Sequence, residues 1–554
     1  EQNDNLEIED EYQSDDDVED HEKNECPNDE NANAVIEGES IIIPSNASLK
    51  GKNLNIWSAV PSKSLASRTS SRNIIHIIPG PTTIAKCAEN PNDAFLLFVN
   101  ETIIDKIVLH TNEEIAKLSQ KYKSFSATIM PTTSNEIRAL FGLLLLAGAL
   151  KNNHLNTAEL FDTKLCGSKF SAVMSERRFN FLVRALRFDD KGTREELKEG
   201  DSFAAIREVW GEFIHNCRTN YKPGSYLTID EQLLGFRGRC PFRMYIPSKP
   251  DKYGIKIVMM CDVRTKYMCD ASPYLGKCTN TGGLPLAEYF VKLLTRCIVK
   301  SHRNITMDNW FTSIKLATEM LKKENQLTIV GTLRQNKPEI PPVMIKKDKD
   351  RKVGTSMFGF DKELTLVSYK AKKNKIVTLL SSMHEQPAVN PNTKKPEIVE
   401  FYNETKGGVD TLDQMCHNMS SNRKTKHWPL AIFYNILNIA GINSWIIYTE
   451  NMIRKNQKKL SRKQFLFQLC EDLTKPWMQY RFTLPTLHRS LHATIEEHLN
   501  ILVPQNSSEL QTQGKRNICY VCPAKNRRMT TTFCSICKKA FYREHRAVVC
   551  TNCE

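Results

Sequence analysis

The hydrophobic pattern of this chain changes from a helical period to a strand period at about residue 226, and this change constrains the fold most. Over residues 79–224, apolar residues recur at steps of three and four, as between Ala205 and Cys217. Downstream, strand-like runs at 226–236, 254–262, 267–275, 304–307 and 327–333 are interrupted by helical patterns at 286–294 and 311–322. The predicted order is β-β-β-α-β-α-β, which is typical of a mixed sheet with flanking helices.

The rest of the chain divides into further segments. We expect an acidic, disordered tail and a linker over residues 1–78, and a β-rich insertion with many Lys and Pro residues over 335–400. Helical patterning returns at Gly408 and lasts to about residue 500; a polar linker at 501–516 and a Cys-rich segment at 517–554 follow. The predicted fold class is multidomain α+β, and 554 residues suffice for several domains.

Two apolar runs need a test as membrane spans. The run at 139–150 is too short to cross a bilayer. The run at 428–448 is long enough, but one Pro and three Asn residues interrupt it. We therefore expect both runs to be buried helices.

The charge of the chain is unevenly distributed. The formal net charge is +14, from 77 Lys and Arg residues against 63 Asp and Glu residues. Residues 1–30 hold 15 acidic residues and one basic residue, so their net charge is −14 and that of residues 31–554 is +28. A strongly basic body disfavours an enzyme of small metabolites and favours a polyanionic partner.

Four aspartates follow the pattern expected of phosphodiester chemistry. Enzymes that cut and join phosphodiesters with two divalent cations need several carboxylates that converge on one point. Asp230 lies inside a predicted strand, and Asp308 directly follows another. Asp410 and Asp413 are three residues apart, which places them on one face at the start of a predicted helix. A mixed sheet could bring these positions to one edge.

Spacing alone leaves other roles open. An Asp at a helix start or after a strand is usually a capping residue. Asp262 and Asp270 also lie in or beside predicted strands and compete with Asp230. The pattern of residues does not decide between these candidates.

Five long motifs surround these aspartates. They are TIDEQLLGFRGRCPFRMYIPSKPDKYGIKIVMMCD (228–262), NITMDNWFTS (304–313), LTIVGTLRQNK (327–337), VGTSMFGFDKELTLVSYK (353–370) and YNETKGGVDTLDQMC (402–416). By these motifs the chain resembles the piggyBac-type DNA transposases, close to the founding insect element, from roughly residue 80 to the C-terminus. The resemblance implies a ribonuclease-H-like catalytic domain built from residues 225–334 and 401–420. It also implies a helical DNA-binding and dimerisation domain built from 79–224 and 421–500.

The resemblance also assigns the acids and the chemistry. It implies that Asp230, Asp308 and Asp410 are catalytic and bind Mg²⁺ or Mn²⁺, with Asp413 as an accompanying catalytic acid. The implied reaction is cut-and-paste transposition in the nucleus, in which transposon ends are nicked, converted to hairpins, reopened and joined through their 3′-OH to TTAA target DNA. The implied partners are double-stranded DNA and a second copy of the chain, in a homodimer or larger synaptic assembly. Two alternatives stay open: a domesticated DNA-binding derivative without transposition activity, and a chromatin protein whose Cys-rich module reads protein.

Two basic clusters flank the predicted catalytic motifs. The candidate DNA contacts are Arg237, Arg239, Arg243, Lys249 and Lys252 after the first strand, and Arg423, Lys424 and Lys426 beside His427. Such residues neutralise phosphates without reading sequence; the alternative is a solvated basic face. Trp310 and Trp428 could stack on a base or pack in the core.

The C-terminal cysteines predict a zinc module. Paired thiolates at CxxC spacing are a strong signal for zinc, which would supply the folding energy of so small a segment. The candidate ligands are Cys519, Cys522, Cys534, Cys537, His545, Cys550 and Cys553. The resemblance implies a two-zinc cross-brace in which Cys534, Cys537, Cys550 and Cys553 form one all-thiolate site.

The second zinc site of this cross-brace is incomplete. Tyr542 stands where the family pattern expects another ligand, so one or two structural zinc ions are expected. Lys525, Arg527 and Arg528 lie among the module's basic residues, which favour DNA contact and could double as a nuclear import signal.

Overall fold

The computed structural model describes residues 41–42, 48–61, 70–124, 126–247, 249–346, 351–500, 517–522, 525, 527–533 and 539–542. The chain divides into two compact units, Glu1–Ile495 and Glu496–Glu554. The acidic tail that is predicted over residues 1–40 lies outside the described residues.

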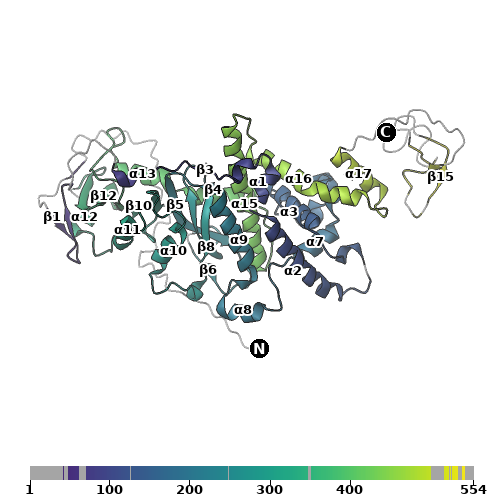
Figure 1. The fold of residues 1–554 in the computed structure, drawn as a ribbon, viewed down its shortest axis with the longest axis horizontal. Helices are drawn as coiled ribbons and strands as arrows, with labels where there is room; N and C mark the ends of the chain where they lie inside the picture. The colour runs from purple at the N-terminus through teal and green to yellow at the C-terminus, as the bar shows by residue number, and fades with distance from the viewer. Residues whose placement is uncertain are drawn as a thin grey trace. The chain divides into compact units, whose positions relative to one another are not determined.

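One large sheet organises the first unit (Figure 1). Its strand order is β1-β2-β11-β12-β13-β10-β9-β5-β7-β6, and β8 pairs with β7. The strands are β1 (Ser48–Lys50), β2 (Ile56–Ser58), β5 (Tyr226–Gly235), β6 (Arg243–Tyr245), β7 (Tyr253–Asp262), β8 (Met268–Pro273), β9 (Asn304–Met307), β10 (Thr328–Thr332), β11 (Ser356–Asp361), β12 (Leu364–Lys372) and β13 (Lys375–Ser381). β9 pairs in parallel with β5 and with β10, whereas the other ladders of this sheet are antiparallel, so the predicted mixed sheet is confirmed.

Helices make up most of the remaining described chain. The α-helices are α1 (Pro91–Leu96), α2 (Glu101–Ser119), α3 (Ser134–Ala149), α4 (Thr157–Leu160), α5 (Thr163–Cys166), α6 (Lys169–Val173), α7 (Glu176–Ala185), α8 (Arg194–Gly200), α9 (Ala204–Asn220), α10 (Leu286–Thr295), α11 (Ile314–Leu321), α12 (Pro342–Ile345), α13 (Glu397–Thr405), α14 (Gly408–Asn418), α15 (Trp428–Arg454), α16 (Arg462–Phe482) and α17 (Arg489–Leu499). Four 3₁₀ turns are η1 (Ser71–Asn73), η2 (Ala85–Cys87), η3 (Ala127–Ile129) and η4 (Gly276–Cys278). In Figure 1, α2, α3, α7 and α16 gather at the opposite end of the first unit from β1, β12 and α12.

Two small hairpins complete the described strands. β3 (Gly80–Pro81) pairs with β4 (Tyr221–Lys222) in the first unit. β14 (Asn517–Ile518) pairs with β15 (Met529–Thr530) in the second unit.

The predicted burial of the two long apolar runs is confirmed. α3 is buried along nearly all of its length. Among the described helices, only α15 is long and apolar enough to cross a membrane by length and composition, and 94% of its apolar window is buried inside the protein. A helix that is apolar on all sides and enclosed by other elements is a core helix.

The structure departs from the predicted linker at residues 41–78. β1 and β2 form a hairpin whose second strand pairs with β11 through Ser58 and Phe360. Trp57 is fully buried, and its indole N–H donates to the Glu339 carbonyl at 2.9 Å. The indole packs where Gly359 leaves room, since a Cβ there would meet the Trp57 Cβ at 3.2 Å. The local composition is polar, and the partners of this hairpin lie about 300 residues away, so no local pattern revealed it.

The predicted β-rich insertion is not separate from the large sheet. β13 pairs with β10, and β12 pairs with β13, so the insertion extends the same sheet. Its core residues Phe358, Val367 and Leu379 pack in one cluster with Val330 of β10. The insertion and the sheet therefore share a hydrophobic core.

We expect the hairpin at residues 48–58 to contribute to the free energy of unfolding, which a solvent-exposed linker would not do. We expect Trp57→Ala to lower the free energy of unfolding by about 3–5 kcal/mol, because it empties a fully buried site. Denaturant unfolding of the full chain measures this. The neighbouring Ile56 is 56% exposed, so Ile56→Ala should change stability by no more than about 0.5 kcal/mol. Equal stability of the two variants would contradict the structural role of this hairpin.

Candidate active site

Asp230 and Asp308 occupy equivalent positions on two neighbouring parallel strands. The last registered pair of β5 and β9 is Ile229 with Met307, and each aspartate is the next residue of its chain. β9 ends at Met307, whereas β5 continues to Gly235. The two carboxylates therefore lie at the C-terminal end of β9, beside the middle of β5. Both side chains are partly buried.

The junction between α13 and α14 is bonded to the same two strands. The Thr228 hydroxyl of β5 donates to the carbonyl of Thr405, the last residue of α13. The Thr306 and Thr405 hydroxyls are hydrogen-bonded at 2.7 Å, and the Thr405 hydroxyl also contacts the Phe401 carbonyl as a donor. Thr228 and Thr306 are themselves a registered pair, two residues before the aspartates.

α14 then begins in direct contact with β5. A Cβ on Gly408 would lie 2.9 Å from the Thr228 Oγ1 and 3.1 Å from the Thr228 Cβ, so only glycine fits at this distance. Further along the helix, the Gln232 Nε2 donates to the Asp413 Oδ1 at 2.6 Å. Thr228, Asp230 and Gln232 occupy every second position of β5, so their side chains lie on the same face of the strand. α14 therefore runs along this face from Thr228 to Gln232, and it carries Asp410 between those two contacts.

The carboxylates influence one another electrostatically. Burial raises the pKa of Asp230 well above its ordinary value, and the charges of Glu231, Asp308 and Asp410 raise it further. Burial and the Glu231 charge raise the pKa of Asp308 to about 6, although two backbone N–H groups that donate to it act in the opposite direction. Carboxylates that raise one another's pKa are stabilised in their ionised form by a cation.

Two lysines lie beside these acids. The Lys249 Nζ is 3.8 Å from a Glu231 carboxylate oxygen. Burial alone would lower the pKa of Lys249, but the charges of Glu231, Asp230, Asp410 and Asp413 raise it. Lys256 is buried on β7 with its Nζ 4.0 Å from the centre of the Trp310 ring, and burial lowers its pKa.

Sequence reasoning did not single out Glu231, Gln232 or Lys256. The signal that could have found them is a polar residue inside an otherwise apolar strand. TIDEQLL contains three consecutive polar residues between apolar ones, and GIKIVMM contains one lysine. A polar side chain in such a strand is costly unless it has a partner or a task.

The donor set suits a hard divalent cation, although its oxygens do not converge. Carboxylate oxygens are the ligands that Mg²⁺ and Mn²⁺ prefer. One oxygen of Glu231, Oε2, is buried without a hydrogen-bond partner. Within the described ranges, no group of three or more His, Cys, Asp or Glu side chains is close enough to hold a metal ion. The acids thus lie on β5, directly after β9 and on α14, without forming a closed coordination shell.

The competing aspartates have structural partners. Asp262 accepts hydrogen bonds from the backbone N–H groups of Gly224 and Thr265 and closes the turn after β7. Asp270 forms a bidentate ion pair with Arg218, with both nitrogen–oxygen distances 2.7 Å. These contacts explain both residues without a metal.

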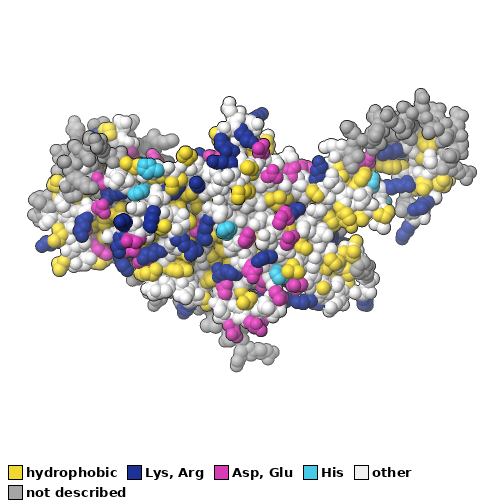
Figure 2. Space-filling view, in the orientation of Figure 1, with side chains coloured by type: hydrophobic (Ala, Val, Ile, Leu, Met, Phe, Trp, Pro, Cys, Tyr) yellow, Lys and Arg dark blue, Asp and Glu magenta, His cyan; other side chains and the backbone are white. Residues whose placement is uncertain are grey.

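Of the predicted DNA contacts after β5, some side chains are exposed to solvent and others are bonded within the fold. Arg237 and Arg239 are exposed, and so is Lys252. The Arg243 guanidinium donates to the Gly238 carbonyl at 3.1 Å and lies over the Tyr253 ring. On the face shown in Figure 2, Lys and Arg side chains gather over the region of α10, α11 and β10.

The second basic cluster is also mixed. Lys424 and Lys426 are exposed. The Arg423 guanidinium, in contrast, donates to the Asn153 and Leu155 carbonyls at 3.1 and 2.7 Å, so the fold itself uses it. Trp428 packs against Phe203 and Phe242 in an aromatic cluster, which is the core role left open for it.

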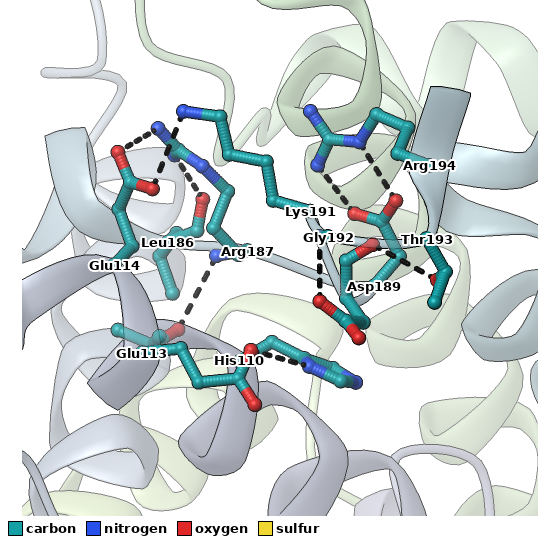
Figure 3. A network of polar contacts seen from close by, with 12 residues as sticks. His110, Glu113, Glu114, Leu186, Arg187, Asp189, Lys191, Gly192, Thr193 and Arg194 are labelled. Carbon is teal, nitrogen blue, oxygen red and sulfur yellow. Dashed lines mark hydrogen bonds and ion pairs between the residues drawn. The ribbon is translucent and has the colours of Figure 1, made fainter. Parts of the chain in front are cut away.

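A further charged network lies between α2 and the segment after α7 (Figure 3). Arg187 and Lys191 both pair with Glu114, at 2.8 and 3.6 Å, and Arg194 forms a bidentate pair with Asp189. Each cation in this network has a carboxylate partner. The network therefore stabilises the segment between α7 and α8, and it is a weaker candidate for phosphate contact than exposed Lys424 and Lys426.

Only part of the predicted zinc module can be examined. Cys534, Cys537, His545, Cys550 and Cys553 lie outside the described residues. Cys519 is buried, and its sulfur accepts the Tyr542 backbone N–H at 3.1 Å. Burial opposes the thiolate, but this and further hydrogen bonds lower the pKa of Cys519, which favours the form that binds metal. Among the candidate DNA contacts here, Lys525, Arg527 and Arg528 are exposed.

The close contact between Gly408 and β5 predicts that a larger residue at position 408 destabilises the protein. We expect Gly408→Ala to destabilise the protein by about 1–3 kcal/mol, because the new methyl group overlaps Thr228. Gly211→Ala is the matched control: Gly211 lies inside α9 with nothing near its Cβ position, so alanine should stabilise by up to about 1 kcal/mol. Thermal unfolding distinguishes these opposite signs, and a stabilising Gly408→Ala would contradict the close contact.

Comparisons with known proteins agree with this architecture. The family model described as Transposase IS4 matches residues 90–445. PiggyBac transposable element-derived protein 3 from Homo sapiens is 25% identical over 382 residues, which cover 65% of this chain and 63% of that protein. PiggyBac transposable element-derived protein 2 from Homo sapiens is 22% identical over 382 residues, or 65% of this chain and 61% of that protein. The chain thus matches less than two thirds of the length of these curated relatives.

A solved structure gives a longer match. The cryo-EM structure of the piggyBac transposase synaptic complex with hairpin DNA aligns with a TM-score of 0.80 and 50% sequence identity, over 86% of this chain and 100% of that chain. The resemblance that the motifs implied is confirmed, and this chain belongs to the piggyBac transposase family.

Proposed function

We propose that this protein is a cut-and-paste DNA transposase. One observation supports the proposal most: the α13–α14 junction is bonded to β5 and β9 two residues before Asp230 and Asp308, and so places Asp410 beside them. In a member of the piggyBac family, aspartates on β5, directly after β9 and on the helix packed against β5 are best explained as catalytic acids.

In this proposal, Asp230, Asp308 and Asp410 would hold Mg²⁺ or Mn²⁺. Such ions polarise the scissile phosphate, activate the attacking oxygen and stabilise the leaving oxygen. The chain's own groups orient the reactants. The partly exposed Lys249 offers a cation to phosphate beside the acids.

The order of steps follows the family. We propose that the protein nicks transposon ends, forms and resolves hairpin ends, and joins the 3′-OH ends to TTAA target DNA. The 50% identical relative, solved as a synaptic complex with hairpin DNA, supports the hairpin step and an assembly of more than one chain. The body's net charge of +28 supports DNA as the partner, and a nuclear location is the corresponding proposal.

A second candidate is a domesticated derivative that binds DNA without transposing it. The human relatives are named as transposable element-derived proteins, which favours this possibility. The four aspartates and their supporting contacts are all present in this chain, which favours the active enzyme.

The catalytic proposal is tested by cutting terminal-repeat DNA with the full-length protein and Mg²⁺. We expect nicked and hairpin products, and we expect Asp308→Ala to cut at least roughly 100-fold more slowly, since even second-layer changes at metal sites cost 10–100-fold. Asp361→Ala, on β11 at the other end of the sheet, is the control and should cut normally. If the wild type makes no nicks, or Asp308→Ala cuts as well as it does, the protein is not this enzyme; retained DNA binding would then favour the derivative.

We also propose that the Cys-rich segment holds one or two structural zinc ions. Metal analysis of the purified full-length protein should give one or two zinc ions per chain, and Cys550→Ser should remove the ion at the all-thiolate site. Cys278→Ser is the control, because Cys278 is an exposed free cysteine outside the module. A wild-type protein without zinc would exclude this proposal.

A further inference from the structure

Gln232 on β5 is a buried amide whose two ends have different partners. Its side chain is 2% exposed. The Oε1 accepts a hydrogen bond from the Asn435 Nδ2 at 2.7 Å, and the Nε2 donates to the Asp413 Oδ1 at 2.6 Å. Because a carboxylate only accepts, the amide N–H₂ must face Asp413, and its oxygen then faces Asn435. The orientation of this side chain is therefore determined by its neighbours.

His417, one turn further along α14, lies near the same oxygen of the Asp413 carboxylate. The His417 Nδ1 lies 3.5 Å from the Asp413 Oδ1, and its Nε2 lies 3.8 Å from an Asp251 oxygen. The Asp413 side chain is 30% exposed, so the carboxylate is partly open to solvent while its Oδ1 accepts from the buried amide. Gln232 is the buried partner that sets where this carboxylate points.

Asn435 connects this pair to α15. It is 1% exposed and lies two turns after Trp428, where α15 begins. The segment directly before α15 carries exposed Lys424 and Lys426. A continuous set of hydrogen bonds thus runs from the helix behind this basic segment, through β5, to the acid on α14.

Packing alone does not require this arrangement. A leucine or methionine has nearly the volume of glutamine, and an apolar side chain would cost nothing in desolvation at this depth. A buried amide that donates to a carboxylate at one end and accepts from a second amide at the other has a fixed orientation, because its donor and acceptor ends cannot be exchanged.

We propose that Gln232 is a positioning residue of the transposition reaction: it orients the Asp413 carboxylate and couples it, through Asn435, to α15. This role rests on the proposed function, in which Asp413 belongs to the catalytic acids. In this role Gln232 contacts neither DNA nor metal and acts through the Asp413 carboxylate.

The hydrogen-bonded pair is tested first by a stability cycle that does not depend on activity. Gln232→Glu places two carboxylates against each other and should lower the thermal midpoint. Combining it with Asp413→Asn restores a hydrogen bond of reversed polarity, with the new asparagine as donor and the new glutamate as acceptor. We expect the combined variant to unfold at a higher temperature than Gln232→Glu alone. If the decrease in thermal midpoint of the combined variant equals the sum of the decreases of the two single variants, the pair is not coupled and the proposal is overturned.

The positioning role is tested by the cutting rate at saturating DNA. We expect Gln232→Leu to lower the nicking rate about 10- to 100-fold, the equivalent of one hydrogen bond to a charged group, with unchanged affinity for terminal-repeat DNA. Asn435→Leu should lower the rate in the same direction. Asn443→Leu is the matched control: Asn443 is fully buried on the same helix but bonds to the Met268 backbone, so it should cost stability and leave the rate unchanged.

The outcomes separate the two proposals. A wild type that does not cut overturns the proposed function. A wild type that cuts beside an equally fast Gln232→Leu variant overturns only the positioning role. Asn443→Leu slowing the reaction as much as Gln232→Leu would show a general effect of helix destabilisation, and would overturn it too.

Discussion

The contact between the start of α14 and strand β5 is the interaction on which the rest of the site depends. Asp230 and Asp410 are 180 residues apart in sequence, and the close approach of α14 to β5 brings them to the same side of this strand. The missing side chain of Gly408 permits this approach, and Thr405 bonds the preceding helix to Thr228 and Thr306. Because Thr228 and Thr306 are registered partners, a single residue fixes the junction on both strands that carry acids.

Holding these acids together works against folding in the absence of a cation. Burial and mutual repulsion raise the pKa of Asp230 and of Asp308, which means that the folded protein resists their ionisation. Lys249 and Lys256 offset part of this charge, but Lys256 is buried against Trp310 and its own pKa is lowered. A bound divalent cation would relieve this repulsion and favour the ionised carboxylates, so ionisation of the acids and cation binding are coupled.

The sheet and the aspartate positions could be predicted from sequence because they depend on short-range patterns. β5, β7, β8, β9 and β10 each match an apolar run to within a few residues, and α10 matches the helical pattern predicted at 286–294. Spacing placed Asp230 and Asp308 at strand positions, but only the parallel register of β5 and β9 makes them neighbours.

Features that depend on partners distant in sequence could not be predicted in this way. The β1–β2 hairpin has a polar local composition, and only Glu339, Gly359 and Phe360 reveal its place. Arg423 reads as a DNA contact because it stands among other cations, yet distant carbonyls occupy its guanidinium. Gln232 resembles any polar residue of a strand until Asn435 and Asp413 are found at its two ends.

The asparagines of α15 show why the predicted helical and catalytic domains form one unit. In an apolar helix of 27 residues, each buried amide must find a partner. Asn435 bonds to β5, Asn443 to β8 and Asn451 to the turn at Ala85 and Ala88. Apolar packing alone would allow the helix to rotate or slide, whereas these three contacts specify one register. α15 is therefore joined to the strand that carries Asp230 by a directional hydrogen bond as well as by apolar packing.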